Sequence, residues 1–168
     1  MGKGRTPILL TGGAVLIGVV RPWMVWGELP PLLASHFGAD GTPDGMSQKT
    51  EFFVMYGLVM VFVLISLLGS VLLMEKIPVK YLNLPNKDYW LSSGKLPQAR
   101  EKMSLAMWWM CAATMLLSTA TLELVLQANL NRAPINSGVM WTLMGAYLIF
   151  SLGWVVKLLT AFTPPDKD

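Results

Sequence analysis

The residues best suited to chemistry gather in one polar segment, residues 27–50. His36, Asp40 and Asp44 lie within nine residues of one another, and a glutamate flanks them on each side. One imidazole and several carboxylates could hold a divalent cation such as Zn²⁺ or Mn²⁺. Their spacing matches no established metal-binding loop, and the calcium pattern D-x-D-x-D-G is absent. We therefore favour the alternative, in which the aspartates shape turns and His36 packs or hydrogen-bonds within a small ordered cap.

A second candidate is Glu123, an acidic residue inside a long apolar stretch. A carboxylate at the centre of a bilayer costs roughly 2.5–3.5 kcal/mol on insertion scales, so its partners matter. Polar residues precede it at helical spacing: Thr114, Ser118 and Thr121. A proton or ion relay could use such a stripe. The favoured alternative is that Glu123 reaches the outer interface and meets solvent or a basic residue, Arg21 or Arg132.

Composition identifies the kind of protein that must position these residues. Of 168 residues, 54% are hydrophobic and 14% are charged, against about a quarter charged in a soluble domain. Three stretches carry no charge over 23, 20 and 19 residues, namely 52–74, 103–122 and 138–156. A helix crosses a bilayer core with about 20 apolar residues, so each stretch is long enough. This excludes a soluble globular domain.

Several chemical classes are excluded as well. One cysteine, Cys111, permits neither an intrachain disulfide nor a CxxC site, and one histidine permits no multi-histidine zinc or bis-histidine haem site. No nucleophile–base pair or phosphate-binding glycine loop is present. We therefore expect no enzyme activity and no cofactor.

The sequence predicts an all-α integral membrane protein that forms a single membrane domain over residues 1–168. Four transmembrane helices are expected at about 6–26, 51–75, 103–127 and 137–162. The first is the shortest apolar run and continues past Arg21, which can snorkel to the interface. Two longer connections remain, an extracytoplasmic loop at 27–50 and a cytoplasmic loop at 76–102.

The basic residues predict the orientation of these helices. With the N-terminus inside, ten lysines and arginines fall on the inner side and three on the outer side. Because basic residues concentrate in cytoplasmic loops, both termini should be cytoplasmic. The net charge of +3 thus reflects topology and gives no reason to expect nucleic-acid binding.

Local patterns refine the loops and helix contacts. Residues 42–45, Thr-Pro-Asp-Gly, favour a turn in which Gly45 adopts a positive φ, and residues 40–41 favour another. The small-residue pair Ala14 and Gly18, and glycines 138, 145 and 153, predict close helix packing. Packing within one bundle explains these small residues, and dimerisation or docking into a larger complex is the alternative.

Two segments resemble a known family. The outer segment has Leu29-Pro30, His36-Phe37, Gly41, Pro43-Asp44-Gly45, Ser47 and Lys49, and a membrane helix follows. This order resembles the extracytoplasmic domain of unknown function in SdpI-like bacterial membrane proteins. The inner segment, residues 84–91, resembles the PN-x-x-YW loop that follows this domain through Pro85, Asn86, Tyr89 and Trp90. The C-terminal immunity half of the group is not recognised in residues 103–168.

The resemblance implies a multi-pass protein of the bacterial inner membrane. We expect an immunity-like, sensor or accessory protein that binds a ligand or partner through His36, Phe37, Asp44, Gly45 and Lys49. The inner loop is expected to meet lipid or a cytoplasmic partner. Membrane lipid and another membrane protein, or a second copy, are the expected partners. The alternatives are a structural subunit of a larger membrane complex and a small ion or metal transporter.

Overall fold

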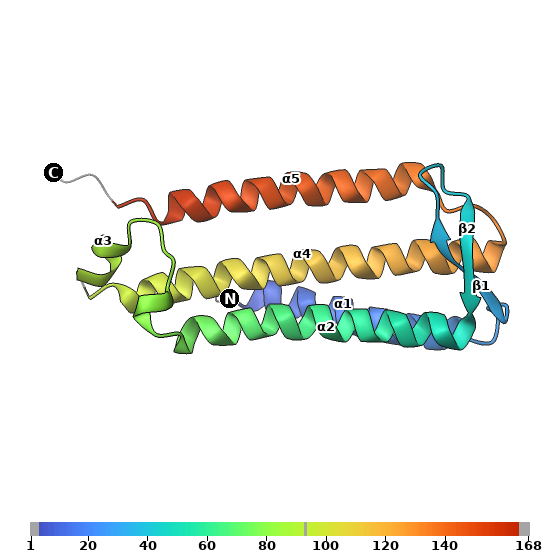
Figure 1. The fold of residues 1–168 in the computed structure, drawn as a ribbon, viewed down its shortest axis with the longest axis horizontal. Coiled ribbons are helices and arrows are strands. Elements are labelled where there is room, and N and C mark those ends of the chain that lie inside the picture. The colour runs from blue at the N-terminus through green and yellow to red at the C-terminus, as the bar shows by residue number, and fades with distance from the viewer. Residues whose placement is uncertain (1–3, 93, 165–168) are drawn as a thin grey trace.

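The structure is a computed structural model that describes residues 4–92 and 94–164. Four of its helices are long and apolar enough to cross a membrane, as predicted, and they run side by side along the long axis (Figure 1). They are α1 (Arg5–Val25), α2 (Lys49–Lys76), α4 (Leu96–Asn131) and α5 (Ser137–Ala161). The segments between them form a two-stranded sheet at one end of the bundle and a short helix at the other. We call these the hairpin end and the α3 end.

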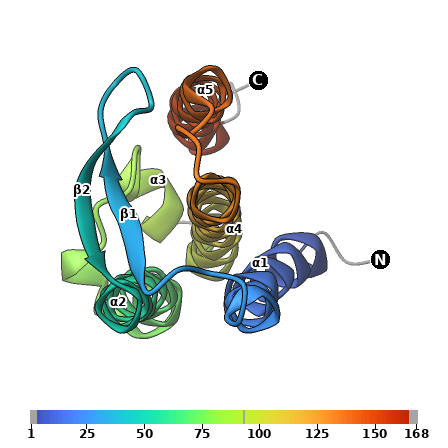
Figure 2. The ribbon, with the colours of Figure 1, turned by 90° about the vertical axis from the view of Figure 1, so that its right-hand side faces the viewer.

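Helix α4 is the centre of the bundle. It packs against α1, α2 and α5, whereas α5 packs against no other long helix in the described chain (Figure 2). Buried residues in the middle and second half of α4 pack with residues of α1 and α2 and include Cys111, Met115 and Leu126. None of the described residues of α5 is buried. The outer faces of the helices are apolar and exposed, as hydrocarbon-facing surfaces are.

Helix α4 is longer than predicted. It begins at Leu96, although we expected it to begin near residue 103, so residues 96–102 of the expected loop are helical. Pro97 lies in the first turn, where a proline removes no helical hydrogen bond. The charges at 100–102 made this stretch resemble a loop, but a polar helical turn can extend beyond an apolar span. Helix α4 also ends at Asn131, four residues beyond the predicted 127, whereas the other three helices begin and end within two residues of the predicted positions.

The outer segment forms an antiparallel hairpin of β1 (Leu32–Phe37) and β2 (Pro43–Gln48). The predicted turn at residues 42–45 is wrong, because Pro43 to Gly45 already belong to β2. The chain reverses at residues 38–41 instead: Gly41 has a φ of 88° and its N–H donates to the Gly38 carbonyl at 2.9 Å. Gly45 is required for another reason, since a Cβ there would lie 2.9 Å from the His36 Cβ across the irregular pairing.

The α3 end is built around Phe162, which follows α5 and is completely buried. A 3₁₀ turn (Val79–Tyr81) and α3 (Lys87–Ser92) lie in the segment between α2 and α4. Their apolar residues Leu82, Leu84 and Trp90 pack with Phe162 and the first turns of α4. This cluster holds the end of α5 in place. Among the described long helices, α5 itself contacts α4 alone.

Candidate functional site

The exposed face of the hairpin carries His36 and Asp44. Their side chains, 76% and 50% exposed, form a hydrogen-bonded pair between His36 Nδ1 and Asp44 Oδ1 across the two strands. The pairing of His36 with Gly45 in the strand register brings Asp44 next to the imidazole. These two predicted site residues therefore lie together, on a surface that a partner could reach.

Asp40 has a local role in the turn. Its Oδ1 accepts hydrogen bonds from the Thr42 backbone N–H at 3.0 Å and from the Thr42 hydroxyl at 2.8 Å. These two bonds hold the pKa of the Asp40 carboxyl below its usual range. The described residues include no group of three His, Cys, Asp or Glu side chains placed to hold a metal. Asp40 is thus a turn-shaping residue, as the favoured interpretation held.

Phe37 and Lys49 lie on less accessible parts of the segment. Phe37 is half-buried opposite Pro43 at the end of the hairpin. Lys49 Nζ donates to the carbonyls of Trp26 and Leu29 at 3.0 and 3.1 Å and lies 4.9 Å from the centre of the Trp26 ring. Lys49 therefore joins the start of α2 to the end of α1.

Asn129 of α4, which was not among the predicted site residues, anchors the hairpin. The Ala34 N–H donates to Asn129 Oδ1 at 2.7 Å, and Asn129 Nδ2 donates to the Ala34 carbonyl at 3.0 Å. The amide thus pairs with β1 as a neighbouring strand would, in a region where both residues are about 6% exposed. Its only sequence signal is that it is polar near the end of an apolar helix.

The tip of the hairpin is anchored separately, beside the start of α5. The Ile135 N–H donates to the Gly41 carbonyl at 2.9 Å, and Trp141 Nε1 donates to the Ala39 carbonyl at 3.2 Å. A Cβ on Gly41 would lie 2.3 Å from the Ile135 carbonyl oxygen, so only glycine permits this approach. The hairpin consequently lies across the end of the bundle from α2 to α5 (Figure 2).

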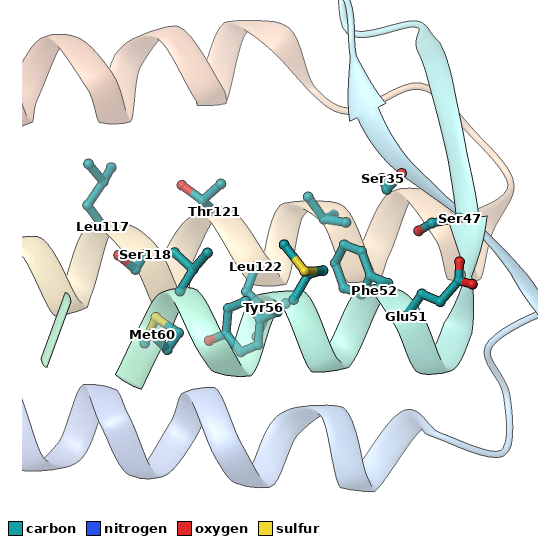
Figure 3. Close-up of a pocket in the computed structure, with 13 residues that line it drawn as sticks. Ser35, Ser47, Glu51, Phe52, Tyr56, Met60, Leu117, Ser118, Thr121 and Leu122 are labelled. Carbon is teal, nitrogen blue, oxygen red and sulfur yellow. The ribbon is translucent and has the colours of Figure 1, made fainter. Parts of the chain in front are cut away.

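Beneath the hairpin, a groove of about 810 Å³ runs between α2 and α4 (Figure 3). Its hairpin end is polar and is lined by Ser35, Ser47 and Glu51. Further along, its walls are mainly apolar, with Phe52, Met55, Val59 and Met60 from α2 and Leu117, Leu122 and Val125 from α4. Sequence reasoning did not find this groove, because it depends on how far two helices and a hairpin stand apart.

Two polar atoms at this groove have no hydrogen-bond partner within the described chain. They are the buried Ser47 Oγ and the Tyr56 hydroxyl. A buried hydroxyl without a partner costs free energy, roughly 1–3 kcal/mol by mutational measures. Glu51 is partly engaged, since its Oε2 accepts from the Gln48 backbone N–H at 3.3 Å in a capping box at the start of α2. The Tyr56 hydroxyl lies on the side of α2 that faces Gly18 of α1, so the exposed Glu51 carboxylate is the polar group that the hairpin end of the groove presents to a bound molecule.

Glu123 faces α1, away from this groove. Its two oxygens accept from Arg21 Nε at 2.9 Å and Arg21 Nη2 at 3.1 Å, and Gln127 Nε2 donates to it at 2.7 Å. Arg21 is one of the partners that the sequence suggested. The stripe does not continue from this pair, because Thr114 contacts the Tyr147 hydroxyl of α5 at 2.9 Å.

The four residues of the inner loop motif form part of the α3 end, beside Phe162. Pro85 and Asn86 form a turn in which Asn86 has a φ of 54°, and both Asn86 Nδ2 and Trp90 Nε1 donate to the Phe162 carbonyl at 3.1 Å. Trp90 is 4% exposed, so the expectation that it meets lipid or a partner is wrong. Tyr89 is half-buried, and its hydroxyl accepts from Lys95. The loop therefore fixes the end of α5 through its hydrogen bonds to Phe162.

Comparison with known proteins gives one match. No curated protein and no solved structure matches the chain significantly. Residues 13–60 match a family described as a domain of unknown function, DUF1648. The matched residues comprise most of α1, the whole hairpin and the first turns of α2, and they include the His36–Asp44 pair. The inner loop lies outside them. The chain is therefore a multi-helix protein with four membrane-length spans that carries a domain of unknown function centred on the hairpin.

Proposed function

We propose that this protein is a non-enzymatic membrane receptor or accessory protein whose hairpin end binds an amphipathic ligand. The observation that carries the proposal is the groove between α2 and α4, polar beneath the hairpin and apolar along its length. An amphipathic molecule buries its apolar part against Phe52 and Val59 and places its polar part beside Ser47 and Glu51. Ligand sites of this kind are largely apolar, with a few polar groups that fix orientation.

Charge favours a cationic or hydrogen-bond-donating head group on this ligand. Glu51 is the one charged side chain among the residues that line the groove in the described chain. In the weakly polar surroundings of an interface, an ammonium group beside this carboxylate is favoured over a carboxylate. A peptide segment with a basic residue or a long-chain amine has the required chemistry.

The groove can be tested with spin-labelled long-chain amine and spin-labelled fatty acid in nanodiscs that contain the protein. We expect an immobilised spectral component that is larger for the amine. Val59→Trp should abolish it by filling the groove, whereas Val61→Trp, on an exposed part of the same helix, should leave it unchanged. Glu51→Gln should remove the preference for the amine. Equal immobilisation in all three variants would contradict the proposal.

We further propose that the hairpin end faces the outside of a bacterial inner membrane, with both termini cytoplasmic. Ten basic residues against three support this orientation. With Cys111 replaced by alanine, single cysteines at Asp44 and Asp88 provide the test. A membrane-impermeant maleimide added to intact cells should label Asp44→Cys alone. Labelling of Asp88→Cys alone would reverse the topology.

Helix α5 supports a second candidate function, that of a subunit in a larger membrane complex. Among the described residues it packs on α4 and on no other long helix, and a Cβ on Gly145 or Gly153 would have no described neighbour within 4 Å. These glycines, predicted to pack inside the bundle, do not do so. Purification from the native membrane distinguishes the two functions, because a subunit co-purifies with larger proteins in fixed stoichiometry and a stand-alone receptor does not.

A further inference from the structure

A second groove, of about 540 Å³, lies between α4 and α5 near the α3 end. Helices α4 and α5 are antiparallel, so the start of α4 and the end of α5 meet there (Figure 1). Each helix contributes one lysine and apolar residues to the lining, which includes Lys102, Trp109, Phe150, Gly153, Trp154 and Lys157. The groove is thus basic at one end and apolar beyond it.

The lysines lie near the ends of the two helices and the aromatic residues lie deeper in the span, in the same order as the head group and acyl chains of a phospholipid. Trp109 lies seven residues after Lys102, and Phe150 lies seven residues before Lys157, which at 1.5 Å per residue places both about 10 Å further into the span. Trp154 Nε1 donates to the Ala106 carbonyl at 2.8 Å and fixes one wall. Gly153 leaves open space, since a Cβ there would meet no atom within 4 Å. An acyl chain fits along this apolar part.

The two lysines determine which head group fits. Lys102 Nζ donates to the Ala161 carbonyl at 2.9 Å and lies 4.6 Å from the centre of the Trp90 ring, so its ammonium is held at the end of α5. An ammonium has three donors, and this contact uses one. Neither Lys102 nor Lys157 forms an ion pair with a described residue. Two lysines with no acidic partner among the described residues attract an anion, and basic pockets between membrane helices bind anionic lipid head groups.

We infer that this groove binds one anionic phospholipid, with its phosphate between Lys102 and Lys157 and an acyl chain along Trp109, Phe150 and Trp154. A free phosphate would leave the apolar groove unused, and a zwitterionic lipid carries no net charge to match the lysines. The site does not depend on the proposed ligand groove, which lies at the opposite end of the bundle. It stabilises the contact of α5 with α4, the only long helix on which α5 packs in the described chain.

The test is native mass spectrometry of the protein released from mixed micelles of phosphatidylglycerol and phosphatidylcholine. We expect one retained phosphatidylglycerol per chain. In the Lys102→Gln/Lys157→Gln variant, its preference over phosphatidylcholine should fall about 30-fold, as expected for the loss of two basic contacts. Lys80→Gln/Lys87→Gln is the matched control, because it removes the same charge at the same end outside the groove, and it should retain the preference.

A second pair of variants tests the apolar part with all charges kept. Gly153→Phe should fill the groove and reduce phosphatidylglycerol retention, whereas Gly145→Phe, on the same helix but outside the lining, should not. Circular dichroism should show the same helix content in every variant. Retention that is unchanged in the groove variants, or that falls equally in the control variants, would overturn the inference in favour of general surface attraction.

Discussion

Replacement of Asn129 by alanine should detach the hairpin from α4. The side-chain amide accepts from the Ala34 N–H at 2.7 Å and donates to the Ala34 carbonyl at 3.0 Å, and both residues are about 6% exposed. Without the amide, two buried backbone groups lose their partner. Each costs about 1–3 kcal/mol when left unsatisfied, so we expect about 2–6 kcal/mol in total. The loss is local, because Gly41 and Trp141 still hold the hairpin tip to the α5 side.

Hydrogen exchange in nanodiscs measures this opening directly. Since about 1.4 kcal/mol corresponds to a factor of ten, the Ala34 amide should exchange roughly 30 to 20,000 times faster in Asn129→Ala. The Trp90 indole N–H, at the other end of the bundle, should be unaffected. Asn131→Ala is the matched control, because Asn131 is exposed and contacts only Gln127 through its side chain in the described chain. Unchanged exchange at Ala34, or an equal change in the control, would refute the anchoring role.

Three further predictions concern other contacts of the bundle. Arg21→Gln or Glu123→Gln alone should lower the free energy of unfolding in detergent by about 1–3 kcal/mol, because each leaves a charged partner without its hydrogen bonds, and the double variant should lose less than the sum. Gly18→Ala should destabilise the bundle, since its Cβ would lie 2.9 Å from the Tyr56 hydroxyl. Tyr56→Phe should be nearly neutral, because this hydroxyl has no described partner. In a thermal melt, adding Tyr56→Phe should restore the stability that Gly18→Ala loses. Asp40 has a lowered pKa in the folded turn, so its contribution to the stability of the turn is present above the ordinary aspartate pKa of about 4 and is lost as the pH falls through the lowered value. An NMR pH titration of the turn amides should show this step, and Asp40→Asn should remove it.

Several features of the fold follow from the chain alone. Three long uncharged stretches and the shorter apolar run before Arg21 predict four membrane-length helices, since a polar backbone in hydrocarbon must satisfy its own hydrogen bonds and a helix does so. The pairing of Glu123 with a basic residue was expected because an isolated carboxylate in a span is costly. Composition and periodicity are properties of neighbouring residues, so they can be evaluated without knowing which helices touch.

The hairpin shows where such reasoning was wrong. Residues 42–45 have the composition of a turn, but Pro43, Asp44 and Gly45 form part of β2, and Gly45 is needed for its closeness to His36 and not for a positive φ. Similarly, Trp90 resembled an interfacial aromatic residue, yet it is buried against Phe162, which lies 72 residues away in the chain. In both cases a contact with a segment distant in sequence decided the role of the residue.

The sequence by itself therefore determined the class of protein and the number of its spans, because hydropathy and charge act residue by residue. Only the tertiary structure decided that α4 is central, that Asn129 holds the hairpin, and that a groove with an acidic residue lies at one end and a groove with two lysines at the other. These depend on the distances between helices, which are set by the sum of many side-chain contacts across the bundle. The residue pattern of one helix does not reveal these distances, because each contact also involves a residue of another segment.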